Sequence, residues 1–238
     1  MVLVLAAVGM AAGVLTSLAG QGGGLFLLLV ASLLVGPHDA LVTTAPALLL
    51  GNFHRAWLYR RSIDRPIAWR MTVGGLPGAL LGGLFAGLMP ASVINVVLVV
   101  MTALAIAKAL GLLRFTVPRA ALAPAGFGIG AMTGTAGGAG VLLAPVLLSS
   151  GLSGPAFVGT SSVVAVVTHL GRVAAYGTTG MFGDPATVAV RAATLALAIF
   201  GGNALAEKLR PLLTPRGVSR IEYGTLVLCV TLSVAGVR

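Results

Sequence analysis

Three long stretches of the chain, 1–37, 71–107 and 120–171, contain no charged side chain. A helix needs about 20 mainly apolar residues to cross a bilayer, so each stretch is long enough for about two passages. Only 8% of the 238 residues are charged, whereas soluble domains carry about 25%. So few charges cannot provide a water-exposed surface. The sequence therefore predicts an all-α integral membrane protein.

Apolar runs separated by helix-breaking residues predict where the helices lie. We expect helical segments at 2–19 with 24–35, 39–59, 70–88, 91–113, 120–136 with 140–152, 156–178, 187–207 and 218–237. Loops rich in Lys and Arg remain cytoplasmic. This rule assigns the loops at 60–70, 114–119 and 208–220 to the cytoplasm, and the turns at 89–90 and 179–186 to the outside. The chain must then enter and return on one side within 2–35 and within 120–152, so both are predicted to be helical hairpins, either re-entrant or fully crossing.

The two halves of the chain match at a constant offset of 117 residues. The matches include Gly13 with Gly130, Thr16 with Thr133, Gly23 with Gly140, Thr43-Thr44 with Thr160-Ser161, Asn52 with His169, Arg55 with Arg172 and Tyr59 with Tyr176. The basic loop follows a different segment in each half, so the halves are expected to be upside down relative to each other, as in many secondary transporters. We predict two inverted repeats, 1–118 and 119–238, each a Gly-tipped hairpin plus three transmembrane helices.

Glycine-rich sequences interrupt both hairpins, at 19–24 and 133–140. Backbone that leaves the helix inside a membrane must be buried in protein or line a cavity. The helices that begin after the breaks present free N–H groups, which suit an anion. The predicted substrate-binding residues are Gly20, Gln21, Gly22, Gly23, Gly24, Thr43, Thr44, Asn52, Thr135, Gly137, Gly138, Gly140, Thr160, Ser161, Ser162, His169 and Arg172. Leucine at position 23 or 140 is expected to abolish transport without unfolding the protein.

Each of these residue types also has a structural interpretation, which the sequence leaves open. Glycines allow close helix packing, and this is the interpretation favoured for Gly74, Gly78 and Gly82. Hydroxyl side chains near a helix start can cap it. Polar residues inside a span can bond a neighbouring helix. Arg55 and Arg172 can either clamp an anion or extend to the membrane surface.

The acidic residues point to the charge of the substrate. Loops or span ends contain all five of them: Asp39, Asp64, Asp184, Glu207 and Glu222. Since no carboxylate is expected inside the membrane, a cation would lack a counter-charge there, and a small anion is favoured. If protons are coupled to transport, His169 is the one group expected to titrate near neutral pH.

Other classes of function are disfavoured. The basic loops account for the formal net charge of +10, so we expect no nucleic-acid partner. The single cysteine, Cys229, excludes an internal disulfide and a multi-cysteine metal site, and we expect neither cofactor nor metal. An intramembrane enzyme is disfavoured because the chain has no HExxH motif, no paired aspartates and no Ser/His pair at recognisable spacing. An anion channel stays open as an alternative.

Two sequences carry a resemblance to a known family, AGQGGGL at 19–25 and AGGAGVLLAP at 136–145, each followed by a hydroxyl-rich run at 42–45 or 158–162. With these motifs the chain resembles the sulfite-exporter TauE/SafE family, also called the toluene sulfonate uptake permease family. The chain departs from the family at Leu28, near which a proline is usual, and at Ala139, which interrupts the second glycine run.

The resemblance implies a multi-pass transporter of the bacterial inner membrane. Its substrate would be sulfite, sulfoacetate or another organosulfonate, moved by alternating access. A different small oxyanion or a carboxylate is the alternative substrate. The expected partners are this anion and the membrane lipids, and the sequence leaves open whether the chain forms a homodimer.

Overall fold

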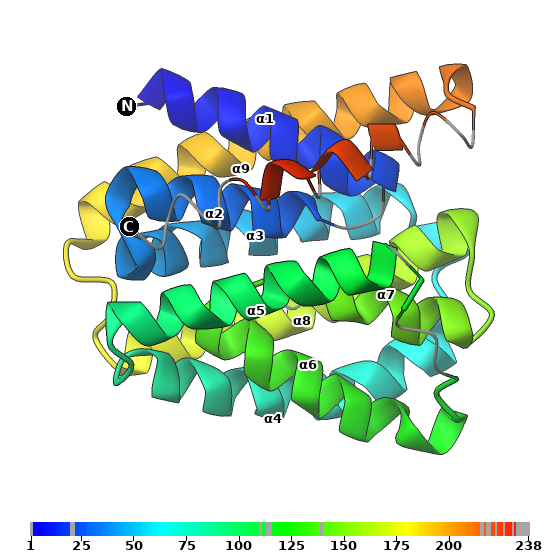
Figure 1. The fold of residues 1–238 in the computed structure, drawn as a ribbon, viewed down its shortest axis with the longest axis horizontal. Helices are drawn as coiled ribbons and strands as arrows, with labels where there is room; N and C mark the ends of the chain where they lie inside the picture. The colour runs from blue at the N-terminus through cyan, green and yellow to red at the C-terminus, as the bar shows by residue number, and fades with distance from the viewer. Residues whose placement is uncertain are drawn as a thin grey trace.

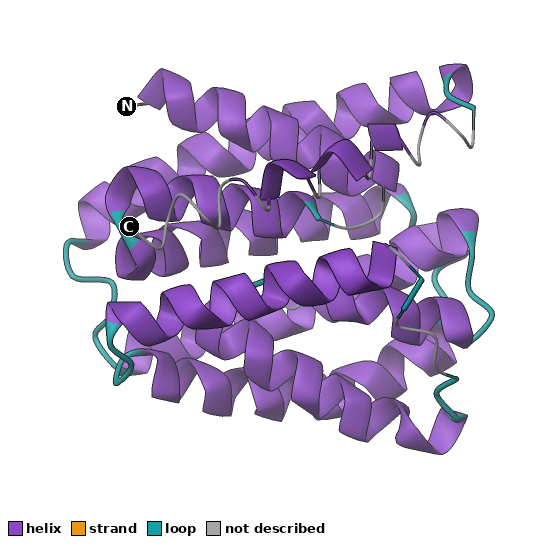
Figure 2. Cartoon of the chain, in the orientation of Figure 1, coloured by secondary structure: helices purple, strands orange, loops and turns teal. Residues whose placement is uncertain are grey.

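The computed structural model describes residues 2–19, 22–109, 111–112, 116–138 and 140–214, followed by 217, 220–221, 223–225, 227–229 and 231. Helices and no strands make up the regular structure of these residues, as predicted (Figure 2). The α-helices are α1 (Val2–Ala19), α2 (Gly23–Val35), α3 (Pro37–Leu58), α4 (Arg65–Ala86), α5 (Ala91–Ala109), α6 (Leu122–Ala136), α7 (Gly140–Ser149), α8 (Gly154–Thr178) and α9 (Pro185–Leu209). Three 3-10 turns accompany them: η1 (Arg60–Ser62), η2 (Arg119–Ala121) and η3 (Arg210–Leu212).

The helices pack into two groups that meet at α3 and α8. One group joins α1 and α2 to α3 and α9, and the other joins α4 to α6 and α8, with α5 against α7. Figure 1 shows α1 and α9 along one edge of the molecule, α4 and α6 along the opposite edge, and α3 and α8 between them. Each group therefore contains segments from both halves of the chain.

Proline and aspartate set the starts of the long helices. Pro occupies the first turn of α3, α4, α8 and α9, where its missing N–H costs nothing. The Asp64 carboxylate accepts a hydrogen bond from the Ile67 N–H at 2.9 Å, so α4 begins at Arg65, before the predicted residue 70. Asp184 caps α9 in the same way, and hydrogen bonds from Thr187 and the Ala186 N–H lower the pKa of its carboxyl group. The predicted helix at 218–237 lies largely outside the described residues.

Glycines let α4 and α6 approach closely. A Cβ atom at Gly74, Gly78 or Gly82 of α4 would collide with α6 backbone, and one at Gly126 or Gly130 of α6 would collide with α4 backbone. Such approach is typical of small residues at helix interfaces in membranes. The packing role expected for the three α4 glycines agrees with these contacts.

Among the described residues, α8 and the segment Pro185–Leu212 are each long and apolar enough to cross a membrane. Four shorter stretches are apolar too: Val2–Leu18, Gly23–Val35, Ala91–Ala107 and Gly140–Ser149. Large apolar side chains also face outward, such as Leu197 of α9 at 69% exposure. A soluble protein rarely exposes much apolar surface, so these outer faces suit a lipid environment.

Contacts between helix ends define two ends of the molecule. At one end, the Arg210 guanidinium lies over the Tyr59 ring, the Asp64 N–H donates to Thr160 Oγ1, and Arg70 donates to the Arg119 carbonyl. Here α3 and α9 finish, and α4, α6 and α8 begin. We call this the basic end because it holds Arg60, Arg61, Arg65, Arg70, Arg119, Lys208 and Arg210.

The opposite end gathers the start of α3 and the two turns near residues 89 and 181. His38 Nε2 lies 3.0 Å from the Met89 carbonyl oxygen, and Arg191 pairs with Asp39 at 3.2 Å. The described residues at this end thus include one arginine, Arg191, and two aspartates, Asp39 and Asp184, whereas the basic end has a large excess of arginine.

Candidate functional site

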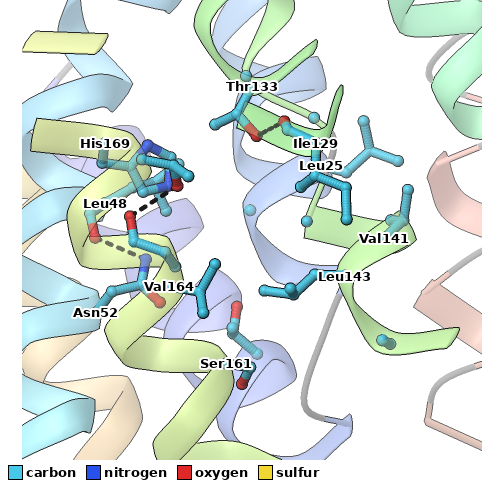
Figure 3. A pocket seen from close by; sticks show the side chains of 18 of the residues that line it. Leu25, Leu48, Asn52, Ile129, Thr133, Val141, Leu143, Ser161, Val164 and His169 are labelled. Carbon is cyan, nitrogen blue, oxygen red and sulfur yellow. Dashed lines mark hydrogen bonds between the residues drawn. The ribbon is translucent and has the colours of Figure 1, made fainter. Parts of the chain in front are cut away.

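A cavity of about 70 Å³ lies between the hairpin breaks and the middle helices α3 and α8. A single water needs about 10–15 Å³ on this measure, so the cavity has room for a small ion with a few waters. Figure 3 shows Asn52 and His169 on one side of the cavity and the apolar side chains of Leu25, Val141 and Leu143 on the other. The described residues that line it are Thr16, Gly22, Gly24, Leu25, Leu48, Asn52, Arg55, Ile129, Thr133, Gly137, Gly138, Gly140, Val141, Leu143, Ala144, Phe157, Ser161, Val164, Ala165, Thr168 and His169.

Arg55, in the last turn of α3, is the charged residue of this lining and is only 4% exposed. Its Nε donates to Ser162 Oγ at 2.6 Å, its Nη1 to the Thr16 carbonyl at 3.1 Å, and its Nη2 to Asn52 Oδ1 at 2.7 Å. A guanidinium has five N–H groups, so two are left for a ligand. No carboxylate of the described residues pairs with Arg55. Its positive charge is therefore buried without a counter-charge from the part of the chain that the structure describes.

Arg172, the matching residue of α8, is fully buried beside the second hairpin break. Its Nε donates to the Tyr176 hydroxyl at 2.8 Å and its Nη2 to the Leu41 carbonyl at 2.9 Å, while Nη1 has no partner among the described residues. A Cβ atom at Gly137 would lie within 2.9 Å of this guanidinium. Gly137 also has a φ of +75°, which favours glycine. The glycine therefore lets the chain turn directly against Arg172.

The starts of α2 and α7 bring backbone N–H groups to the cavity. α2 begins after Gly22, which has a φ of +88°, and no side chain caps the helix. Gly22, Gly24 and Gly140 all line the cavity. The first N–H groups of a helix have no partner within the helix, and they carry the positive end of its dipole. Both helix starts therefore add positive potential to the cavity.

The hydroxyl groups of the lining donate to backbone carbonyls of their own helices. Thr16 and Thr133 each donate to the carbonyl four residues earlier, at 2.6 and 2.7 Å. Ser161 donates to the carbonyl three residues earlier, at 3.0 Å. Because these protons are already used, the donors that the described residues leave for an anion are the Arg55 guanidinium, the Asn52 amide, the His169 ring N–H and the backbone N–H groups.

A model of the family described as Sulfite exporter TauE/SafE matches residues 5–234, nearly the whole chain. The chain belongs to the TauE/SafE family. No curated protein and no solved structure matches it significantly. The family is one of membrane transporters of sulfur-containing anions, so the resemblance seen in the glycine-rich motifs is confirmed, and the chain is a transporter and not an enzyme.

The cavity brings together about half of the substrate-binding residues predicted from the sequence. Its lining includes Gly22, Gly24, Asn52, Gly137, Gly138, Gly140, Ser161 and His169. Away from the lining lie Gly23, Thr43, Thr44, Thr135, Thr160, Ser162 and Arg172. Gly20 and Gln21 lie outside the described residues.

The residues away from the lining have other contacts. Thr44 donates to the Ala40 carbonyl at 2.7 Å, and Thr160 accepts from the Asp64 N–H at 2.9 Å. Ser162 does not line the cavity itself, but its hydroxyl accepts a hydrogen bond from Arg55, which does. Neighbouring residues on a helix point in different directions, so a run of hydroxyls cannot place every member at one site.

The sequence leaves Arg55 between two interpretations and does not single out Thr16, Thr133 or Thr168 as binding residues. Thr16 and Thr133 are a matching pair in the two halves, so their recurrence was an available signal. The role of Arg55 depends on the Thr16 carbonyl and on Ser162, both distant in sequence. The apolar part of the lining carries no sequence signal that separates it from the other leucines and valines.

Proposed function

We propose that this TauE/SafE protein moves a small sulfur-containing anion, sulfite or an organosulfonate, across the bacterial inner membrane by alternating access. The observation that carries the proposal is Arg55, a buried cation on the cavity wall that no described carboxylate pairs with. Moving an unpaired charge from water into the protein interior costs roughly several kcal/mol of free energy. An anion in the cavity supplies the missing counter-charge.

The donors around the cavity suit an ion with several acceptor oxygens. Two N–H groups of Arg55 and one of the Asn52 amide are free, since the other amide hydrogen goes to the Leu48 carbonyl. The N-terminal ends of α2 and α7 add backbone donors. Sulfite and sulfonates present three oxygens to such donors. A cation of the same size would meet the positive charge of Arg55 and gain no carboxylate.

Alternating access in this proposal relies on two inverted repeats, which the glycine contacts support. Gly13 and Gly130 lie 117 residues apart, and their Cβ positions would meet the carbonyls of Ile199 and Gly75, which lie 124 apart. Gly9 and Gly126 meet the carbonyl oxygens of residues 195 and 71, again 124 apart.

A second pair of contacts, with the glycines now on α4 and α9, shows the same offsets of 117 and 124 residues. Gly78 of α4 meets the Phe127 carbonyl of α6, and Gly202 of α9 meets the Met10 carbonyl of α1. The α4–α6 interface therefore has the same register as the α9–α1 interface. Matching helices also run in opposite directions, since α3 ends and α8 begins at the basic end.

The proposed orientation places the basic end in the cytoplasm. Seven basic side chains of the described residues lie there, and the opposite end has one arginine paired with an aspartate. Positively charged loops are retained on the cytoplasmic side during insertion. The protein is then multi-pass, with the turns near residues 89 and 181 outside.

Flux into proteoliposomes tests the proposed substrate. Sulfite and sulfoacetate are offered beside acetate and methylammonium, and we expect saturable uptake of the sulfur anions and none of the cation. Arg55→Gln removes the buried charge and should weaken apparent affinity about 10- to 100-fold, because hydrogen bonds to charged groups contribute about 1.5–3 kcal/mol. Arg191→Gln, in the exposed ion pair with Asp39, is the matched control with near-normal uptake. Uptake of methylammonium in place of the anions would contradict the proposal.

A further inference from the structure

Arg55 and Arg172 occupy matching positions in the two halves but have different surroundings in this conformation. Arg55 lines the cavity, and Arg172 does not. Arg172 is instead covered by Gly137 of the hairpin break, and its Nη1 is buried without a hydrogen-bond acceptor. A fully buried guanidinium nitrogen without a partner is costly. The unused N–H groups of Arg172 therefore match a ligand that is not seated there in this state.

The two guanidiniums also reach matching points on the opposite half of the chain. Arg172 donates from Nη2 to the Leu41 carbonyl of α3 at 2.9 Å. Arg55 donates from Nε to Ser162 Oγ, and this hydroxyl donates at 2.6 Å to the Val158 carbonyl of α8. Leu41 and Val158 are 117 residues apart. Each arginine is thus connected to the matching carbonyl of the other half, Arg172 by a direct hydrogen bond and Arg55 through the Ser162 hydroxyl.

The cavity itself extends towards one end of the molecule. Its lining takes residues 48–55 from the second half of α3 and residues 157–169 from the first two thirds of α8, and both segments lead to the basic end. Ser161, which is 4% exposed, belongs to this lining, whereas Thr44, its match in the first half, is 0% exposed and does not. Arg172 and Thr44, which lie further towards the opposite end on α8 and α3, are outside this lining.

We propose that Arg55 and Arg172 alternate as the anion-binding arginine, Arg55 in the state open to the basic end and Arg172 in the state open to the opposite end. This inference rests on the proposed function. In the second state the break at Gly137 withdraws from Arg172, the Nη1 donors face the substrate, and Ser161 and Thr44 exchange their exposure. The anion passes from one guanidinium to the other at the junction of α3 and α8.

Two single cysteines test the exchange in a Cys229→Ala background, which removes the one native thiol. Ser161→Cys and Thr44→Cys are treated with a membrane-impermeant thiol reagent from each face of oriented vesicles. We expect Ser161→Cys to react from the basic-end face and Thr44→Cys from the opposite face only. Thr178→Cys, near the opposite end of α8, is the reference for that face.

Substrate protection then assigns each arginine to one state. Sulfoacetate should slow labelling of both cysteines. Arg55→Gln should abolish protection of Ser161→Cys and leave that of Thr44→Cys, and Arg172→Gln should give the converse. A purely structural role for either arginine would not produce this crossed pattern, because misfolding would change both cysteines alike.

The outcomes separate this inference from the function on which it rests. If sulfur anions neither protect the cysteines nor are transported, the proposed function fails and the arginine exchange with it. If the anions are transported but Thr44→Cys never reacts from the opposite face, the exchange alone is wrong. The labelling of Thr44→Cys needs no arginine substitution, so this test remains valid even if Arg172→Gln does not fold.

Discussion

Gly23 and Gly140 open the second helix of each hairpin, yet they have different neighbours. A Cβ atom at Gly23 would collide with Thr16 Oγ1 and the Ala12 carbonyl, whereas one at Gly140 would meet nothing within 4 Å. The expectation that a larger residue at either position spares the fold therefore conflicts with the contacts of Gly23. Gly23 closes the hairpin by packing, and Gly140 faces the cavity.

Alanine at these two positions should separate packing from transport. Gly23→Ala is expected to lower the melting temperature in detergent, since overpacking costs about 1–3 kcal/mol. Gly140→Ala should keep the melting temperature and reduce anion uptake, because its methyl group enters the cavity. Thermal melts and initial uptake rates of the two variants provide the check. Equal melting temperatures would show that the Gly23 contact is not tight in solution.

The hydroxyl-rich runs show how far single residues could be predicted. Sequence alone indicated that 43–44 and 160–162 lie near a break, but of these only Ser161 reaches the cavity. The direction of each side chain depends on the rotation of its helix, and that is fixed by packing against the other half of the chain. The choice for Arg55 was decided in the same way, by partners distant in sequence.

At the scale of the elements, most helix limits followed from prolines, glycines and charge-free runs. The start of α4 differed because Asp64 caps the helix at Arg65, five residues before the sequence-based start. Charged residues at 65 and 70 suggested a loop, although they occupy the first turns of a helix. The pairing of α4 with α6 and of α1 with α9 was not predicted, because glycine spacing does not name the partner helix.

The two glycine interfaces should respond alike to substitution. Gly78→Ala in α4 and Gly202→Ala in α9 place a methyl group against the backbone of α6 and α1, respectively. Both should lower the melting temperature by a similar amount. Gly128→Ala is the control, since a Cβ atom there meets nothing within 4 Å and alanine favours the helix by about 1 kcal/mol. A large loss for one variant and none for the other would argue against equivalent interfaces.

For the molecule as a whole, the sequence predicted a helical membrane transporter, and the family match confirms it. The cavity could be placed at the glycine-rich breaks because helix interruptions inside a membrane need protein around them. Its offset towards the basic end could not be predicted, since both halves of the chain carry the same motifs. In the proposed exchange of the two arginines, this offset would move to the other side of the junction of α3 and α8.

Counterflow in proteoliposomes tests the central claim, transport of a sulfur anion by alternating access, most directly. Vesicles loaded with unlabelled sulfoacetate or sulfite are diluted into a trace of the same labelled anion. In a carrier, the binding site that releases an unlabelled anion outside can bind a labelled anion and carry it inward. We therefore expect labelled anion to accumulate transiently inside the vesicles above its equilibrium level. Arg55→Gln should lose this overshoot. Uptake that only approaches equilibrium, unchanged by the internal anion, would indicate a channel and contradict the account.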